Sequence, residues 1–206
     1  MIAFFKGTPF TKLVNAKKLK NIIEKKKDKS IINHRKVIYF INKMKIYTVI
    51  LAAGEGKRMR SRTPKVLHKF GQVPMINNTL LLAKELNSEK VIVVTGHKAP
   101  EVESWVMENY PEVHFVRQET QLGTGHAVKI VEKSIPQNEA LLLILYGDTP
   151  FVNTATINKM VEEKNNGANI VVLGFKEEKS NSYGKLIQSQ TGYLQKIVEH
   201  KDANFQ

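Results

Sequence analysis

The sequence predicts an α/β domain built on a doubly wound, mainly parallel sheet. From residue 46 onward, apolar β-branched runs alternate with segments of helical periodicity, a pattern typical of parallel sheets covered on both faces. The strongest apolar runs are continuous, as in strands that are buried on both sides. Glycine-rich or polar segments follow these runs directly, and ligands of such sheets bind beyond the carboxyl ends of the strands.

The expected elements follow one another in strict alternation. The first strand, IYTVILAA, stops at Gly54. Proline fits the first turn of a helix but cannot continue one, so Pro100 and Pro111 mark the start and the end of a helix. In order, the expected segments are a strand at 46–53, a helix from Pro74 to Leu86, a strand at 91–96, a helix between Pro100 and Pro111, a strand at 113–116, a helix from about Gly123, a strand at 141–148, a helix at about 154–165, a strand-like run at 168–175, and shorter strands within 183–188 and 193–200.

The composition limits the class of protein. A chain of 206 residues with 42% hydrophobic and 25% charged residues is ordinary for a globular protein with one α/β domain. The absence of cysteine excludes disulfides and thiolate metal sites, and it favours a cytoplasmic location. No apolar run reaches the roughly 18 residues that a membrane span needs. We therefore expect no membrane span.

The net charge of +13 is concentrated in the first part of the chain. Residues 1–43 hold 12 of the 32 Lys and Arg and only two of the 19 acids, which leaves residues 44–206 nearly neutral. We therefore divide the chain into a basic Lys/Ile/Asn-rich extension, 1–43, and a domain, 44–206, and expect no nucleic-acid partner for the domain. For the extension, a solvated and partly helical tail is one interpretation, and a basic arm that touches RNA, DNA or anionic lipid is another. A third is that it is not translated, because Met44 stands directly before the first strand.

The loop after the first strand, Gly54-Glu55-Gly56-Lys57-Arg58-Met59, can bring backbone N–H groups close to a phosphate or a base. A dinucleotide fingerprint would need a small residue in place of Met59, and a P-loop would need Ser or Thr after its lysine. A plain glycine turn is the simpler alternative. Arg58 and Lys65 add the fixed cations that a nucleotide's α-phosphate needs.

Two further strand ends carry chemically suggestive residues. The amide of Gln118 offers both a donor and an acceptor to a base edge, whereas Thr124 can simply be the N-cap of the next helix. Asp148 ends the most apolar strand, where a carboxylate can bind magnesium or cap the turn before Pro150. His126 is interpreted as a packed helix residue.

The string LAAGEGKRMRSRTPKVLHKFGQVPM, residues 51–75, resembles the signature of the sugar nucleotidyltransferases. The segment QETQLGTGHA, 118–127, is similar to the base-reading loop of the N-acetylglucosamine-1-phosphate uridylyltransferases in particular, and the likeness runs from about residue 46 to 203. It implies a Rossmann-like fold of the nucleotide-diphospho-sugar transferase type. It also implies UTP and N-acetylglucosamine-1-phosphate as substrates, with Mg²⁺ as the cofactor.

The resemblance assigns roles to particular residues. It implies that Arg58 and Lys65 are catalytic and that Asp148 is the metal ligand. It also implies that Gln118 and the backbone of Gly123 read uracil. Gly184 and Glu199 would contact the sugar. The full set of substrate-binding residues is Leu51, Ala52, Ala53, Gly54, Lys65, Gln118, Gly123, Thr124, Tyr146, Gly147, Gly184 and Glu199.

The chain also departs from the family. The family's domain continues beyond the equivalent of Gln206 and supplies a second magnesium ligand there, and no hexapeptide repeat of its β-helical partner domain occurs here. We therefore expect a C-terminally incomplete sheet with an unpaired edge and weak or absent turnover. The alternatives are a catalytically inactive nucleotide-binding remnant, another NTP and sugar-1-phosphate pair, and completion by a second chain or by a homo-oligomer.

Overall fold

The computed structural model describes residues 2–6, 45–136, 140–176 and 184–198. Most of the extension 1–43 lies outside these residues, as does Glu199. The chain divides into two compact units, one up to Val171 and one from Val172, and each is described by itself.

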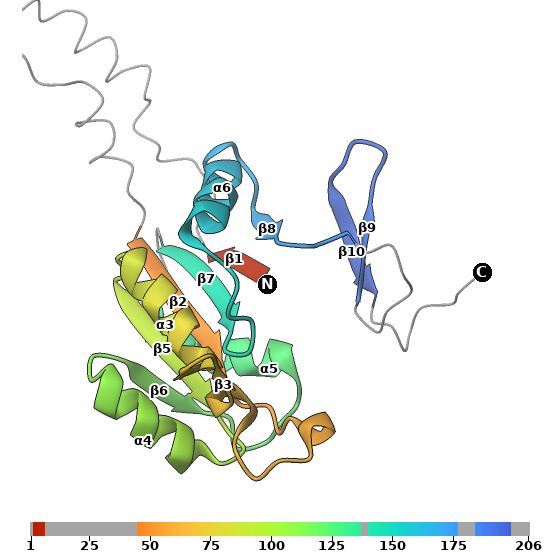
Figure 1. Cartoon of the computed structure of the whole chain (residues 1–206). Helices are drawn as coiled ribbons and strands as arrows, with labels where there is room; N and C mark the ends of the chain where they lie inside the picture. Colours follow the sequence, from red (N-terminus) through yellow and green to blue (C-terminus); the bar gives the residue numbers. More distant parts are fainter. Residues whose placement is uncertain (1, 7–44, 137–139, 177–183, 199–206) are drawn as a thin grey trace, which may run out of the picture. The chain divides into compact units, whose positions relative to one another are not determined.

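The first unit is built on parallel strands, as the sequence predicted. β2 occupies the centre and pairs in parallel with β5 on one side and β7 on the other, and β6 extends the sheet beyond β5. The strand order is β6-β5-β2-β7-β1-β8 (Figure 1). The bounds are β1 Ile2–Lys6, β2 Lys45–Leu51, β5 Lys90–Thr95, β6 His114–Arg117, β7 Ala140–Tyr146 and β8 Ile170–Val172.

The strand β1 was not predicted. Although it comes first in the sequence, it lies between β7 and β8 and pairs antiparallel with β7, with Ile2 opposite Ile144 and Lys6 opposite Ala140. Its formation joins a piece of the extension to the sheet. The domain boundary predicted at residue 44 therefore does not separate all of the extension from the fold.

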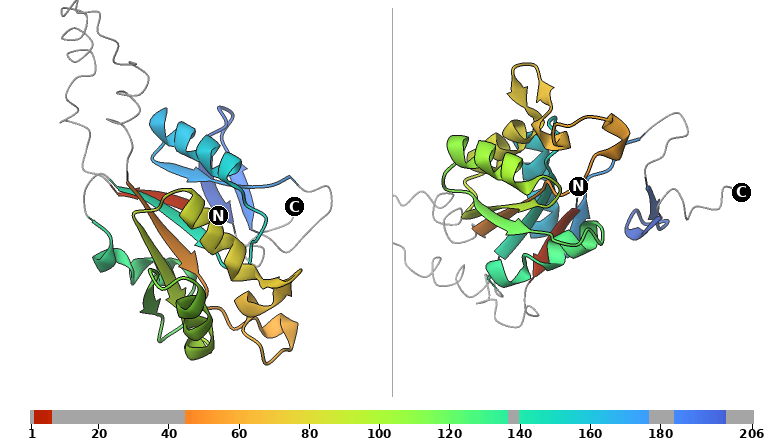
Figure 2. Two further views of the ribbon diagram at one scale, coloured as in Figure 1. Left: turned by 60° about the vertical axis from the view of Figure 1, so that its left-hand side comes forward. Right: turned by 90° about the horizontal axis from the view of Figure 1, so that it is seen from below.

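Helices cover both faces of the sheet. In Figure 2, α3 and α4 lie on one face and α5 lies on the other. On the α5 side, alternate residues of β2, β5 and β7 pack with Ala127 and Val131 into a buried cluster. The opposite face buries Ile76 and Leu80 of α3 and Val102 of α4. The bounds are α3 Met75–Glu85, α4 Ala99–Asn109, α5 Thr124–Lys129 and α6 Thr154–Asn165.

Short elements complete the two units. After β2 come two 3-10 turns and a small hairpin that leads into α3, and a third 3-10 turn precedes β7. The second unit contains an antiparallel hairpin, β9 with β10, within the two segments where short strands were expected. The bounds are η1 Lys57–Met59, η2 Lys65–Leu67, β3 Lys69–Phe70, β4 Val73–Pro74, η3 Glu132–Ser134, β9 Lys185–Gln188 and β10 Leu194–Val198.

Within the part of the chain that the structure describes, none of the helices is both long enough and apolar enough to cross a membrane.

Candidate active site

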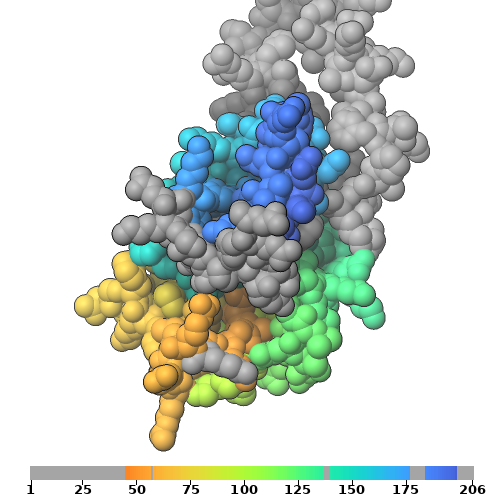
Figure 3. Space-filling model, turned by 90° about the vertical axis from the view of Figure 1, so that its right-hand side faces the viewer, coloured from red at the N-terminus to blue at the C-terminus, as the bar shows by residue number. Residues whose placement is uncertain are grey.

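A pocket of about 680 Å³ opens at the carboxyl ends of β2 and β7. Its volume lies within the range of about 300–1,000 Å³ that small-molecule sites occupy. In the space-filling view, orange atoms of the segment after β2 and green atoms of the Gln118–Thr124 segment lie to either side of it (Figure 3). The lining residues are Leu51, Ala52, Ala53, Gly54, Gly56, Arg58, Met59, Lys65, Val66, Gln118, Gln121, Gly123, Thr124, Ala127, Tyr146 and Asp148.

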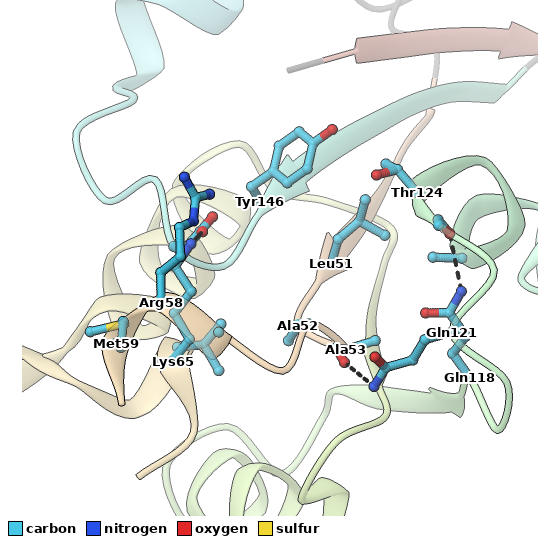
Figure 4. Close-up of a pocket in the computed structure, with 16 residues that line it drawn as sticks. Leu51, Ala52, Ala53, Arg58, Met59, Lys65, Gln118, Gln121, Thr124 and Tyr146 are labelled. Atoms are coloured by element: carbon cyan, nitrogen blue, oxygen red, sulfur yellow. Dashed lines mark hydrogen bonds and ion pairs between the residues drawn. The ribbon is translucent and has the colours of Figure 1, made fainter. Parts of the chain in front are cut away.

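The polar groups of the pocket lie at two ends. Arg58 and Lys65 stand together at one end, and Gln118, Gln121 and Thr124 stand at the other (Figure 4). Cations at one end suit phosphates, and amides at the other suit a planar base with its own donors and acceptors. The two ends of the pocket therefore match the two ends of a nucleotide, its phosphates and its base.

Gly56 fixes the path of the loop toward Lys65. Its φ of +64° lies in the left-handed region that favours glycine. A Cβ at this position would stand 2.9 Å from the Cβ of Lys65. The glycine thus allows the loop after β2 to pass directly beneath the side chain that enters the pocket.

Lys65 forms an ion pair with Asp148 at the end of the pocket that carries the two cations. Pro64 precedes the 3-10 turn that carries Lys65, and Asp148 follows the end of β7. The two side chains are 35% and 24% exposed, so the pair is partly screened but open to ligand. The carboxylate that the sequence singled out as a magnesium ligand is therefore neutralised by a protein cation.

The turn after β7 is closed by Thr149 instead of Asp148. Both the backbone N–H and the hydroxyl of Thr149 donate to the Tyr146 carbonyl, at 3.2 and 3.0 Å. The partner found for the Asp148 carboxylate is Lys65. This arrangement disagrees with the alternative in which Asp148 is only a turn cap.

Gln118 is buried at the amide end, with 5% of its surface exposed. Its backbone N–H donates to the Thr95 carbonyl at 2.8 Å, which ties the start of the loop to the end of β5. Its side-chain nitrogen donates to the Gly123 carbonyl at 3.1 Å and contacts His126 Nδ1 at 3.0 Å. The amide is thus held rigidly at the wall of the pocket.

Gln121 closes the loop over the end of β2. Its side-chain nitrogen donates to the Ala53 carbonyl at 2.9 Å, and the same carbonyl accepts from the His97 N–H at 3.2 Å. Gly96 is needed at this junction because a Cβ there would stand 2.9 Å from the Ala53 Cβ. The ends of β2 and β5 and the Gln118 loop therefore meet at Ala53.

A second hydrogen-bond network, centred on Glu103 of α4, holds the residue that precedes Gln118. Glu103 of α4 accepts a hydrogen bond from buried Thr95 at 2.6 Å and forms a two-pronged ion pair with Arg117, at 2.9 and 2.6 Å. The hydrogen bond from Arg117 is the main cause that lowers the pKa of Glu103 below its ordinary value. The residue that immediately precedes Gln118 is thus anchored to α4.

Comparison with known proteins identifies the domain. Residues 48–200 match the MobA-like NTP transferase domain, which is most of the chain. The chain belongs to this family. The prediction of a nucleotidyltransferase domain is therefore confirmed, and so is the α/β fold class with its mainly parallel sheet.

Among curated proteins, this NTP transferase domain is similar to proteins named bifunctional protein GlmU. It is 42% identical to that of Paracoccus denitrificans (strain Pd 1222) and 44% identical to that of Ruegeria sp. (strain TM1040), in each case over 156 residues. These alignments cover 76% of this chain and 34% of each relative. The chain thus spans about a third of the length of the curated relatives it matches.

Solved structures show the same fold. A nucleotidyl transferase from Methanothermobacter thermautotroptrophicus is 28% identical, with a TM-score of 0.51, over 57% of each chain. HddC from Yersinia pseudotuberculosis, complexed with GMP-PN, is 22% identical and has a TM-score of 0.58 over 74% of this chain and 68% of its own. The second likeness supports the fold of the NTP transferase domain.

Most of the residues expected in the site lie around this pocket. Gly147 stands beside it, with its N–H donating to the Leu51 carbonyl at 3.0 Å. Gly184 belongs to the second unit, and Glu199 lies outside the described residues. The predicted residues that line the pocket are Leu51, Ala52, Ala53, Gly54, Arg58, Lys65, Gln118, Gly123, Thr124, Tyr146 and Asp148.

Two details of the loop differ from expectation. Gly123, with φ of +91°, is the N-cap of α5, and Thr124 is the first helical residue, so the interpretation of Thr124 as the N-cap was wrong. Gln121 lines the pocket although the sequence did not single it out. Its position in a segment rich in amides and glycines was the only signal available, because its contact with Ala53 depends on the fold.

Proposed function

We propose that this domain transfers a uridylyl group from UTP to N-acetylglucosamine-1-phosphate, giving UDP-N-acetylglucosamine and pyrophosphate. The main observation behind this proposal is that the loop of Arg58 and Lys65, the Gln118–Thr124 segment and Asp148 all line the same pocket. Identity of 40–44% to proteins named GlmU supports this choice of substrates.

The reaction needs positioning and charge neutralisation more than covalent chemistry. A phosphate oxygen of the sugar phosphate attacks the α-phosphorus of UTP in line, and the bond from that phosphorus to the oxygen that bridges to the β-phosphate breaks. Pyrophosphate leaves with that oxygen. Arg58 and Lys65 offset the negative charge that shifts between the phosphates during this exchange.

The opposite end of the pocket suits the base. Gln118 and the backbone of Gly123 hold the uracil ring, and Thr124 lines the same wall. In the proposed complex Gly184 and Glu199 contact the sugar, and their place in this function rests on sequence resemblance.

Asp148 fits a magnesium site of the type that nucleotide enzymes use. Mg²⁺ prefers hard oxygen ligands and is commonly held by one or two carboxylates together with substrate phosphates. When bound, the ion would neutralise the phosphate oxygens and polarise the α-phosphate. On the protein side, Asp148 must then exchange Lys65 for the ion, which frees Lys65 to contact phosphate.

A second candidate function is nucleotide binding without turnover. Among the residues that the structure describes, no group of three or more His, Asp or Glu side chains could hold a metal ion, and Asp148 is the one carboxylate among the described residues that line the pocket. A metal held by a single carboxylate relies on the substrate for most of its ligands. A second chain or a second copy that supplies another carboxylate would complete the site.

One experiment separates the two functions. The purified chain is mixed with UTP, N-acetylglucosamine-1-phosphate and Mg²⁺, and pyrophosphate release is followed alongside calorimetric titration with UTP. Release together with binding supports the transferase, and binding without release supports the nucleotide-binding function. If UTP does not bind, both are wrong. Assays with CTP and dTTP test the choice of base.

A further inference from the structure

The turn after β7, which carries Asp148, is packed against η2 and α3. Gly147 has no room for a side chain, because a Cβ there would stand 3.1 Å from the Cγ1 atom of Val66 in η2. On the buried side, the hydroxyl of Thr79 in α3 donates to the Tyr146 carbonyl at 3.4 Å. The turn is therefore joined at more than one place to the segment that carries its ion-pair partner.

Two aromatic side chains join the same two segments at the surface. The rings of Phe70 in β3 and Phe151, three residues after Asp148, meet edge to face, with centroids 4.8 Å apart and planes at 87°. In Figure 1 the loop after β7 reaches the hairpin of β3 and β4. Phe70 is 53% exposed and Phe151 is 74% exposed. Because so much of each ring stays in water, the contact is better placed to join two segments than to bury apolar surface.

The links between the two rings and the ion pair are short and stiff. Only a threonine and a proline stand between Asp148 and Phe151, and the proline ring fixes one of the two soft backbone angles of its residue. On the other side, the carbonyl of Lys65 accepts from the His68 N–H at 3.2 Å, which closes the 3-10 turn directly before β3. A displacement of either ring is therefore transmitted to the charged group nearby.

We propose that Phe70 and Phe151 are positioning residues that hold the Asp148 carboxylate against Lys65. Neither ring is among the described residues that line the pocket, so each acts through the segment to which it belongs. The positioning needs no ligand, whereas its part in nucleotidyl transfer rests on the proposed function, in which both charged groups act at the phosphates. Loss of the aromatic contact lets the turn after β7 move, and the carboxylate then spends less time beside the lysine.

A zero-length crosslink measures this positioning on the chain without ligand. A carbodiimide joins an amine to a carboxylate that touches it, as an amide with loss of water, and peptide mass spectrometry quantifies the product. The ion pair of Lys45 with Glu89, 2.7 Å between Nζ and Oε1 at the opposite end of β2, is an internal standard. We expect the ratio of the Lys65–Asp148 product to this standard to fall about threefold in Phe151→Ala, the equilibrium effect of one aromatic pair.

Further variants separate the aromatic contact from a general loss of apolar surface. Phe70→Ala and the double variant Phe70→Ala/Phe151→Ala should give the same ratio as Phe151→Ala, because each removes the same contact. Phe151→Tyr keeps the ring and should keep the ratio of the unaltered chain. Met107→Ala, on α4, removes an apolar side chain that is 59% exposed and should leave the ratio unchanged. Because all of these side chains are exposed, none of the substitutions leaves a cavity in the core.

Three results of the crosslink would overturn the inference. The first is an unchanged ratio in Phe151→Ala, and the second is an equal fall in Met107→Ala. The third is a fall in the double variant equal to the sum of the two single effects, because additive effects mean that the rings act independently.

Turnover tests the consequence for the reaction. In the pyrophosphate assay, Phe151→Ala should lower kcat about tenfold, less than the hundredfold that a displacement of about 1 Å can cost, and leave the KM for UTP within about twofold. The KM should hold because the base lies at the other end of the pocket. In an Asp148→Asn chain the same substitution should have no further effect, and a further tenfold fall would overturn the inference. An unaltered chain without turnover would contradict the transferase function, and the crosslink alone would then decide the inference.

Discussion

At the scale of single residues, the decisive feature of the pocket is the ion pair between Lys65 and Asp148. Among the described residues that line the pocket, Asp148 is the one carboxylate, and the pair places it against a cation at the end where the phosphates of a nucleotide would lie. An ion pair that solvent can reach contributes little to stability, about 0–1 kcal/mol at the surface. The pair is therefore better suited to rearrange on ligand binding than to hold the fold together.

Lys65→Ala should abolish most of the turnover in the pyrophosphate assay. Removal of one fixed donor to a transition state typically costs about 100- to 1,000-fold in kcat. The same substitution should tighten Mn²⁺ binding, measured by electron paramagnetic resonance, because Asp148 loses its competing cation. Lys84→Ala, on the exposed side of α3, is the matched control and should leave both measurements unchanged. An unchanged rate in Lys65→Ala would refute the catalytic assignment.

Gly56→Ala should harm both stability and nucleotide binding. The new Cβ would strain a backbone with φ of +64° and would stand 2.9 Å from the Lys65 Cβ. Gly71→Ala is a matched control, because Gly71 has φ of +67° but no atom within 4 Å of such a Cβ. Both variants should lose about 1 kcal/mol of unfolding free energy to backbone strain.

Calorimetry with UTP should then separate the two glycine variants. Only Gly56→Ala should weaken binding, because only its methyl group displaces Lys65. Equal affinities in both variants would show that the close approach of Gly56 to Lys65 has no role in the pocket.

At the scale of elements, the link between β5, α4 and β6 holds the start of the Gln118–Thr124 segment in place. Glu103 joins a buried threonine at the end of β5 to Arg117 at the end of β6, directly before Gln118. The charged form of Glu103 is the one that both partners stabilise, so its pKa in the folded protein is lowered. Stability is therefore linked to the charge of this carboxylate.

The contribution of Glu103 should be present at neutral pH and lost in acid. A lowered folded-state pKa means that the unfolded chain binds more protons, so stability falls as the pH drops from the ordinary value of 4.5 through the folded-state pKa. Urea unfolding of Glu103→Gln and of the unaltered chain should differ at pH 7 by about 1 kcal/mol and converge in acid. A difference that stays constant with pH would contradict this linkage.

At the scale of the whole molecule, the sheet of the first unit combines parallel strands with one antiparallel strand. β2, β5, β6 and β7 form the parallel part and carry the pocket at their carboxyl ends, as the alternation of strands and helices predicts. β1 lies at the start of the basic extension 1–43, and its five residues pair with β7. The sheet thus uses a strand that is distant in sequence from its neighbours.

A chain that begins at Met44 should be less stable than the full chain. Without β1, the backbone groups of β7 that face it lose their hydrogen-bond partners, and an unpaired strand edge favours aggregation. We expect the melting temperature to fall by at least about 2 °C, which corresponds to a loss of about 1 kcal/mol at this size. Light scattering should show earlier aggregation. Equal melting curves would mean that β1 adds nothing to the fold.

Much of the fold was predictable because it is encoded locally. The central strands of the sheet show continuous apolar runs, and α6 matches the expected range of 154–165. The pairing of β1 was not predictable, since nothing in residues 2–6 says which strand they will pair with. The small hairpin of β3 and β4 was also missed, because two-residue strands carry no periodicity.

Sequence patterns alone pointed to most of the residues that line the pocket, although they missed Gln121. A glycine loop, a glutamine loop and a strand-end aspartate each follow a buried strand, and parallel strands end on the same edge of a sheet. How these groups face one another could be seen only in the folded chain. The pairing of Lys65 with Asp148 and the contact of His126 with Gln118 depend on packing between segments and on the direction of single side chains. Local sequence patterns specify neither, because hydrogen-bond partners in space are set by the register and packing of the complete fold.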